Sequence, residues 1–175
     1  RDVSLGWTGG VNRRSVAELV IGFALSMLRK LPDANDAVSN DDWHQVVGRQ
    51  LSDCTIGIIG CGHVGQDLGR ILRAGFDCRV LAHDIQDHPT YYTETGVMPS
   101  SLDALLREAD VISVHLPHDT STANILDATH LGMIKASAIL INTARGGLVD
   151  EMAIKQMLKA GTLAGAAFDV FACEP

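Results

Sequence analysis

The stretch Thr55-Ile-Gly-Ile-Ile-Gly-Cys-Gly-His-Val-Gly65 decides the fold of this chain. Its first five residues form a short apolar run that ends at a glycine, as a buried parallel strand does. The next six have the pattern G-x-G-x-x-G, which provides a tight turn, close approach of a pyrophosphate and close packing of helix on strand. The helix N-terminus would present free N–H groups and a positive dipole end to the anion. The stretch therefore predicts a dinucleotide site, and the expected lining residues are Gly60, Gly62, His63, Val64 and Gly65.

Apolar runs and helical segments alternate from this stretch to the end of the chain. The expected strands are Thr55–Ile59, Arg79–His83, Val97–Met98, Val111–His115, Ala138–Asn142 and Ala164–Val170. The expected helices are Val64–Arg73, Ser101–Glu108, one or two short helices within Ile125–Ile134, and a helix that runs from Asp150 to Lys159 and ends before Gly161. Such alternation is typical of right-handed βαβ units, which build a parallel sheet with helices on both faces. The sequence therefore predicts a doubly wound α/β domain of the Rossmann type with strand order 3-2-1-4-5-6.

A long helix is expected ahead of the first strand, over Ser15–Lys30. Ser15 and Glu18 have the S-x-x-E spacing of a capping box, and Pro32 is expected to stop the helix. The helix is apolar on nearly every side, which predicts burial against its own domain and against another surface. The polar residues 33–53 are expected to be irregular, with Trp43 as an anchor.

The length and composition are typical of one globular domain. A chain of 175 residues, 46% hydrophobic and 20% charged, is long enough to bury a core. We expect one dinucleotide-binding domain over 1–175, with an entry segment and interface helix in 1–32 and the Rossmann core in 55–170. The net charge of −7 and the scattered positions of the 14 Lys and Arg residues exclude a nucleic-acid binder. No apolar run is long enough to span a bilayer.

The four cysteines, which are Cys54, Cys61, Cys78 and Cys173, form no C-x-x-C pair and have no zinc-type spacing. We expect unpaired thiols in a reducing compartment, and therefore a cytoplasmic location. No group of His, Cys, Asp and Glu residues has ligand spacing, so we expect no metal. Cys61 and His63 lie within the glycine loop and are expected to face solvent or the pyrophosphate.

A carboxylate follows the second predicted strand. Asp84 lies 19 residues after Gly65, where it can accept hydrogen bonds from both ribose hydroxyls of an adenosine and repel a 2′-phosphate. Asp87 adds negative charge, and no arginine follows this strand. The pattern favours NAD over NADP, although a solvated aspartate in a turn would have the same sequence.

The stretch from Asn142 to Glu151 follows another predicted strand. Ligands bind outside the carboxyl ends of the strands in such sheets, and the guanidinium of Arg145 suits bidentate contact with a carboxylate. A salt bridge with a surface aspartate is an equally good reading of Arg145 from its position alone. Asp150 and Glu151 are expected to cap the next helix. At the end of the last strand, Asp169 could accept a hydrogen bond from a nicotinamide amide.

Together these motifs resemble the D-isomer-specific 2-hydroxyacid dehydrogenases, a family that includes phosphoglycerate dehydrogenase, glycerate or glyoxylate reductase and D-lactate dehydrogenase. The resemblance rests on the glycine loop, on Asp84, on I-N-T-A-R-G-G-L-V-D-E at 141–151 and on D-V-F-x-x-E-P at 169–175. Further agreement comes from S-V-A-E at 15–18, Trp43 and H-L-P-x-x-x-x-T at 115–122. It extends over essentially the whole chain.

The resemblance implies roles for individual residues. Arg145 would grip the substrate carboxylate and polarise the 2-oxo group, and Glu174 would hydrogen-bond the catalytic histidine and raise its pKa. Asp169 would fix the carboxamide of the nicotinamide. The residues implied to line the cofactor are Leu116, Pro117, Thr122, Thr143, Ala144 and Arg145.

Two parts of the family pattern are missing. The family's histidine lies some way beyond the glutamate, and none of the seven histidines here stands in that motif. The separate substrate domain is also absent, so we expect the chain to be the central piece of a longer enzyme and inactive by itself. A homodimer through the Ser15–Lys30 helix is implied as well.

Two functions are therefore open. The first is an NAD-dependent dehydrogenase that interconverts a small D-2-hydroxy acid and its 2-oxo acid, most like phosphoglycerate dehydrogenase. The second is an NAD(H)-sensing module without turnover, as in the transcriptional corepressors of the family. Retention of Arg145 and Glu174 favours the enzyme.

Overall fold

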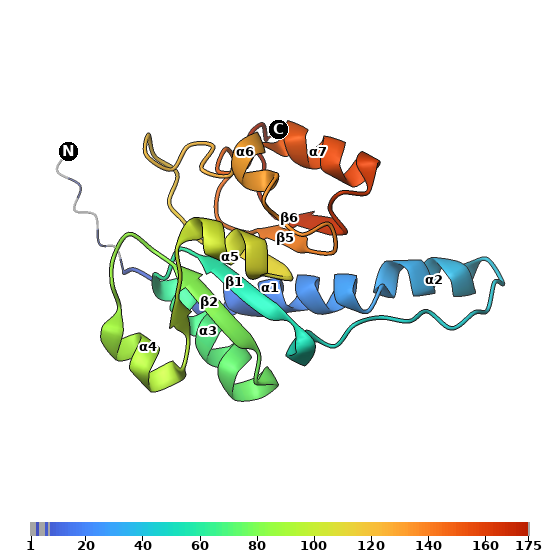
Figure 1. Cartoon of the computed structure of the whole chain (residues 1–175), viewed down its shortest axis with the longest axis horizontal. Helices are drawn as coiled ribbons and strands as arrows, with labels where there is room; N and C mark the ends of the chain where they lie inside the picture. Colours follow the sequence, from blue (N-terminus) through green and yellow to red (C-terminus); the bar gives the residue numbers. More distant parts are fainter. Residues whose placement is uncertain (1–2, 4–5, 7, 175) are drawn as a thin grey trace.

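A parallel sheet forms the centre of the chain (Figure 1). The computed structural model describes residues 3, 6 and 8–174. The strands are β1 (Thr55–Ile59), β2 (Arg79–His83), β3 (Met98–Pro99), β4 (Val111–Val114), β5 (Ile139–Asn142) and β6 (Gly165–Phe168). Their order in the sheet is β3-β2-β1-β4-β5-β6, and every neighbouring pair is parallel. The predicted strand order and fold class are confirmed.

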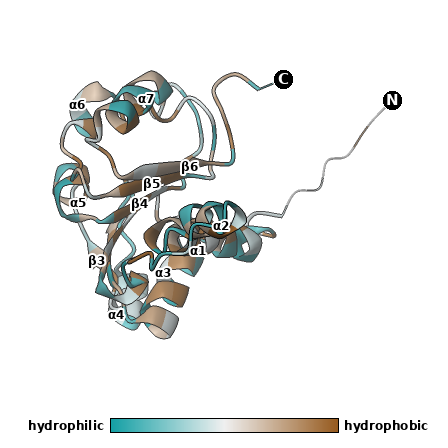
Figure 2. Ribbon diagram, turned by 90° about the vertical axis from the view of Figure 1, so that its right-hand side faces the viewer, coloured by the Kyte–Doolittle hydropathy of each residue, from teal (hydrophilic) through white to brown (hydrophobic). Residues whose placement is uncertain are grey.

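Helices cover both faces of the sheet (Figure 2). The helices of the described chain are α1 (Arg13–Leu28), α2 (Leu31–Ser39), α3 (His63–Phe76), α4 (Pro89–Thr95), α5 (Leu102–Glu108), α6 (Ala128–Leu131) and α7 (Glu151–Ala160), with a 3₁₀ turn at Leu51–Asp53. Because side chains alternate along a strand, Ile58 packs into the core under α1 and α3, whereas Ile59 packs into the core under α5, α6 and α7. None of the helices in the described part of the chain is long and apolar enough to cross a membrane.

The N-terminal helix begins two residues earlier than predicted. Asn12 precedes α1 without a side-chain cap, and the Ser15 hydroxyl donates to the carbonyl of Asn12 at 2.9 Å. The predicted capping box of Ser15 and Glu18 is therefore wrong. Lys30 adopts a left-handed conformation with φ 52° and turns the chain directly into α2. Pro32 accordingly lies in the first turn of α2, where a missing N–H is tolerated. The prediction that residues 33–53 are irregular is therefore wrong for residues 33–39, which belong to α2.

The described chain by itself buries one face of α1 only. Ala17, Val20, Ala24 and Leu28 are buried under the sheet, whereas Leu19 on the other side is 36% exposed. Arg14 makes two hydrogen bonds of 2.9 Å to the carboxylate of Asp67, and this ion pair fastens the start of α1 to α3.

The helix α2 and residues 40–50 extend away from the sheet (Figure 1). Trp43, which was predicted to be an anchor in this segment, is 85% exposed and is not packed into the described domain. The helix α4, which forms within the connection after β2, was not predicted, although Pro89 at its first position and Gly96 after its last residue are helix-boundary signals. By contrast, α7 is capped as predicted, because Asp150 accepts the N–H of Ala153 at 2.9 Å and Gly161 ends the helix with φ 69°.

Candidate active site at the carboxyl edge of the sheet

The residues predicted to bind a cofactor come together at one edge of the sheet. The glycine loop follows β1, Asp84 follows β2, Leu116 and Pro117 follow β4, the Thr143–Arg145 segment follows β5 and Asp169 follows β6. All six strands are parallel, so these positions share the carboxyl edge. The strand order reverses between β1 and β4, and such a switch point is where doubly wound sheets bind ligands.

The glycine loop has the geometry that its pattern predicts. Gly60 has φ +97°, and a Cβ on it would lie 2.7 Å from the carbonyl oxygen of His115. A Cβ on Gly65 would collide with the carbonyl oxygen of Gly60, so only glycine lets α3 pack this close to β1. A Cβ on Gly62 would meet no described atom within 4 Å. The loop is thus tight on its inner side and open where a ligand would approach.

Cys61 and His63 of the loop face opposite ways. His63 is exposed at the first position of α3, as predicted. Cys61 is fully buried in the core under α1 and α3, so the prediction that it faces solvent is wrong. Burial raises the pKa of the Cys61 thiol to about 11, and the group is therefore an unreactive thiol.

Asp84 is held by backbone donors. Its Oδ2 accepts the N–H of Cys61 at 2.6 Å, its Oδ1 accepts the N–H of Gln86 at 2.9 Å, and the side chain is 13% exposed. Nε2 of His88 lies 4.0 Å from Oδ2. Sequence analysis missed His88, although the i, i+4 spacing from Asp84 was a visible signal. The carboxylate is consequently fixed beside the glycine loop before any ligand arrives.

The loop after β4 is closed by a threonine. The hydroxyl of Thr122 donates to the carbonyl of Pro117 at 2.7 Å and accepts the N–H of Asp119 at 2.9 Å. The described hydrogen bonds of Thr122 therefore stabilise the Leu116–Thr122 turn.

His115, at the end of β4, was not predicted to bind a ligand. One of its ring nitrogens lies 2.8 Å from the Ser113 hydroxyl, and desolvation lowers the pKa of His115 to about 4.

The turn after β5 presents Arg145. The Asn142 side chain donates to the carbonyl of Arg145 at 2.9 Å and accepts the N–H of Ala144 at 3.1 Å, which fixes the turn. Arg145 is exposed, and its guanidinium donates to the carbonyl of Ala144 at 2.6 Å. No acidic side chain among residues 8–174 forms a salt bridge with it. The alternative that Arg145 only forms a salt bridge with a surface aspartate is therefore disfavoured.

The hydroxyl of Thr143 lies in the same turn and is buried without a hydrogen-bond partner among the described residues. An unpaired buried hydroxyl is costly, and a ligand bound at this edge of the sheet would supply the missing partner. Together with the open side of Gly62 and the fixed carboxylate of Asp84, this hydroxyl shows that the residues fit a dinucleotide.

The segment after β6 lies against the Arg145 turn. The N–H of Asp169 donates to the carbonyl of Asn142 at 3.0 Å. A Cβ on Gly146 would collide with the carbonyl of Phe171, so the two segments touch there. Glu174 is exposed, and its Oε1 accepts the N–H of Phe171 at 3.1 Å. Arg145 and Glu174 are therefore carried by two segments in contact.

Glu151 differs from its predicted role. Asp150 alone caps α7, and Oε1 of Glu151 accepts instead the N–H of Ala172 at 2.7 Å. The sequence separation of 21 residues gave no local signal for this contact.

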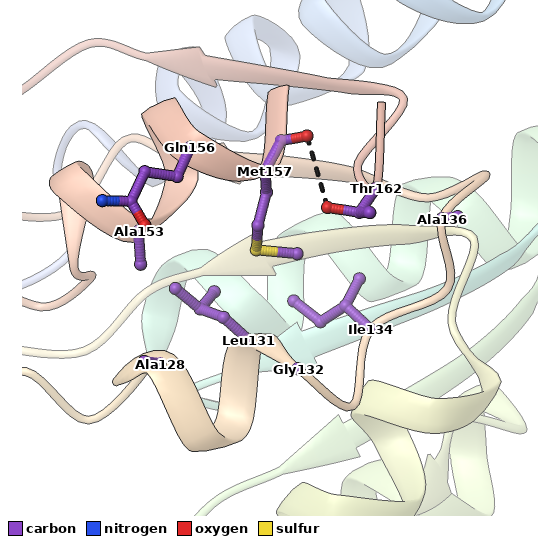
Figure 3. Close-up of a pocket in the computed structure, with 9 residues that line it drawn as sticks. All are labelled: Ala128, Leu131, Gly132, Ile134, Ala136, Ala153, Gln156, Met157 and Thr162. Carbon is purple, nitrogen blue, oxygen red and sulfur yellow. Dashed lines mark hydrogen bonds between the residues drawn. The ribbon is translucent and has the colours of Figure 1, made fainter. Parts of the chain in front are cut away.

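A separate pocket of about 450 Å³ lies between α6 and α7 (Figure 3). Ala136 and Thr162 in its lining precede β5 and β6, so it faces the amino edge of the sheet. Its lining contains no titratable side chain. Within the described ranges, no group of His, Cys, Asp and Glu residues could hold a metal ion. The residues predicted to bind the cofactor lie at the opposite, carboxyl edge.

Comparison with known proteins finds relatives over nearly the whole chain. The family model of the D-isomer specific 2-hydroxyacid dehydrogenase NAD binding domain matches residues 21–175. D-3-phosphoglycerate dehydrogenase of Haemophilus influenzae is 42% identical over 172 residues, which cover 94% of this chain and 40% of that protein. Glyoxylate reductase of Thermofilum pendens is 35% identical over 182 residues, which cover 100% of this chain and 53% of that protein.

Solved structures give the same grouping. D-lactate dehydrogenase of Aquifex aeolicus, complexed with NAD and lactic acid, matches with a TM-score of 0.86 and 32% identity. The match covers 91% of this chain and 48% of that one. The chain thus spans about half, or less, of the length of the relatives that it matches.

Proposed function

The chain belongs to the D-isomer specific 2-hydroxyacid dehydrogenases as their NAD-binding domain, and on this basis we propose that its enzyme interconverts a small D-2-hydroxy acid and its 2-oxo acid with NAD(H). The observation that carries this proposal is the position of Arg145. It stands at the carboxyl end of β5 without an acidic partner in the described part, beside the segment that bears Glu174. A free guanidinium beside a dinucleotide cleft is suited to a substrate carboxylate.

The cofactor would lie across the switch point. The glycine loop and the N-terminus of α3 would hold its pyrophosphate, and Asp84 would hold the adenosine ribose. The Leu116–Pro117 turn, Thr143 and Ala144 would line it, and Asp169 would receive the nicotinamide carboxamide. When bound, the nicotinamide supplies or accepts the hydride. Arg145 would orient the 2-oxo acid and stabilise the negative charge that develops on its oxygen.

Hydride transfer to a 2-oxo acid also needs a proton donor. Arg145 and Glu174 alone do not provide one, so the site is incomplete within these residues. We place the catalytic histidine and the substrate domain outside the 175 residues. Glu174 would support that histidine, because a neighbouring carboxylate favours the protonated imidazole.

The reaction of phosphoglycerate dehydrogenase is our preferred assignment, and the relatives reported above are named as dehydrogenases or reductases, which favours the enzyme over a sensing module. The intact enzyme should oxidise D-3-phosphoglycerate with NAD in a spectrophotometric assay of NADH at 340 nm. D-Lactate and D-glycerate serve as the competing D-acids, and L-lactate as the stereochemical control. Turnover of another D-acid instead of D-3-phosphoglycerate would change the substrate that we assign to the enzyme. Failure with every D-acid would contradict the proposal that the protein is an enzyme.

We also propose a homodimer. The exposed side of α1 and the projecting segment leave large apolar side chains uncovered, including Trp43 at 85% and Val47 at 75% exposure. Uncovered apolar surface of this kind is typical of a self-associating face.

A cytoplasmic location is proposed as well, because Cys54, Cys61, Cys78 and Cys173 are all free thiols.

Light scattering at micromolar concentration should give the mass of a dimer. Trp43→Ser is expected to raise the dimer dissociation constant about tenfold, because an aromatic side chain at the centre of an interface carries much of its binding energy. Met152→Ser is the matched control, since Met152 is 65% exposed on α7, away from this segment. A monomeric parent protein, or equal weakening by both variants, would contradict the proposed interface.

A further inference from the structure

The first residue of α7 reaches across to the segment that carries Glu174. Glu151 accepts the N–H of Ala172 at 2.7 Å and is partly buried. It makes no capping bond to its own helix in the described contacts, because Asp150 fills that role. The carboxylate is thus used in a tertiary contact rather than a local one.

This contact is one of few that fasten the segment. Asp169 is bonded to Asn142 at the end of β6, and the bond between Phe171 and Glu174 is local. The ring of Phe171 stacks on Phe168 at 6.0 Å, but residues 171–174 are exposed. Among the described residues, the bond from Ala172 to Glu151 is therefore the hydrogen bond that ties residues 170–174 to another element.

The hydrogen bond from Ala172 to Glu151 links the segment that carries Glu174 to the segment that carries Arg145. Glu151 follows Arg145 by six residues in the connection between β5 and α7, and Gly146 in that connection lies against the Phe171 carbonyl. The contact at Gly146 fixes one side of the segment, and the bond from Ala172 to Glu151 fixes the next residue. Together they set where Glu174 stands relative to Arg145.

We propose that Glu151 is a positioning residue, which holds the Glu174-bearing segment against the Arg145 turn through its bond to the Ala172 N–H. This inference rests on the proposed function, because it concerns how Glu174 supports a histidine. Displacement of a supporting group by about 1 Å is enough to slow an enzyme tenfold or more. The side chain must reach Ala172 and accept a hydrogen bond, whereas its charge is not required.

Three substitutions separate reach from charge. Glu151→Gln keeps the reach and loses the charge, Glu151→Asp keeps the charge and loses the reach, and Glu151→Ala loses both. In the intact enzyme, Glu151→Ala and Glu151→Asp should lower kcat/KM for the 2-oxo acid about tenfold, with Glu151→Gln close to the parent. The dissociation constant of NADH should stay unchanged in all three, because the described hydrogen bond of Glu151 goes to Ala172 and not to the glycine loop or Asp84.

The pH profile distinguishes positioning from a general loss of stability. Reduction needs the protonated histidine, so kcat/KM falls at high pH, and a displaced Glu174 moves that fall to lower pH. Glu151→Ala and Glu174→Gln should therefore shift the alkaline limb in the same direction, by about one pH unit. Asp103→Ala is the control, because Asp103 is likewise an acidic residue in the first turn of a helix.

The outcomes are distinct. An unshifted alkaline limb in Glu151→Ala, or a Glu151→Gln variant as impaired as Glu151→Ala, would overturn the positioning role. The melting temperature of each variant identifies unfolding, and Glu151→Asp, which keeps the first-turn charge of α7, tests the same contact if Glu151→Ala does not fold. If Arg145→Ala and Glu174→Gln both retain full activity, the proposed function itself fails. If those two lose activity and Glu151→Ala matches the parent, only the present inference fails.

Discussion

Arg145→Ala in the intact enzyme is expected to lower kcat/KM for the 2-oxo acid about a thousandfold and to change the NADH dissociation constant by less than about twofold. The guanidinium is exposed at the carboxyl end of β5, and its one described hydrogen bond goes to the carbonyl of Ala144. It holds neither the sheet nor the glycine loop. Its loss should therefore remove the grip on the substrate carboxylate without disturbing the dinucleotide site. Steady-state kinetics and a fluorescence titration with NADH measure the two effects separately.

The controls for this prediction use other cations. Arg145→Lys keeps the charge but loses the planar fork, so it should recover only part of the rate. Arg79→Ala removes an exposed arginine that pairs with Glu108 at 2.6 Å, at the start of β2 and away from the carboxyl edge, and should leave kinetics unchanged. Full activity in Arg145→Ala would show that the substrate carboxylate is bound elsewhere. A large loss of NADH binding would instead show that the cofactor contact implied for Arg145 by the family resemblance is its main role.

The parts of the fold that were predicted correctly depend on local signals. The strand β1 and the glycine loop are fixed by an apolar run, a positive φ at Gly60 and the close approach at Gly65. The cap at Asp150 depends on a residue three positions away. By contrast, α2 begins after Lys30, which has a left-handed backbone conformation. The residue type does not predict this conformation, because lysine rarely adopts it. Ser15 has the spacing of a cap but bonds to Asn12, because the helix had already begun.

Within the site, position along the sheet was predictable and side-chain direction was not. The end of each parallel strand defines the carboxyl edge, so Asp84 and Arg145 could be assigned to it from order alone. Cys61 was placed wrongly because the loop turns its side chain into the core, where packing under α1 and α3 decides burial. The role of Glu151 was predicted wrongly because its partner, Ala172, is 21 residues away in the sequence and lies close to it only in the folded chain.

The choice between NAD and NADP is expected to depend on Asp84. Asp84→Ala in the intact enzyme should weaken NADH binding about 100-fold, which is what two charge-assisted hydrogen bonds to the ribose hydroxyls are worth. Binding of NADPH should weaken much less than binding of NADH, because the same change removes a negative charge that repels the 2′-phosphate. Parallel fluorescence titrations with NADH and NADPH would show the preference for NADH disappear.

The existing bonds of Asp84 require a second variant. Its Oδ2 accepts the Cys61 N–H, so Asp84→Ala also removes a support of the glycine loop, which would weaken both cofactors alike. Asp84→Asn keeps an acceptor for that N–H and removes the charge, so it should lose less NADH affinity and gain NADPH affinity. Asp87→Asn removes a neighbouring charge and should reduce the preference far less than Asp84→Asn does. Equal loss of both cofactors in Asp84→Asn would assign Asp84 to loop support alone, and an unchanged NADH affinity in Asp84→Ala would remove it from the ribose site.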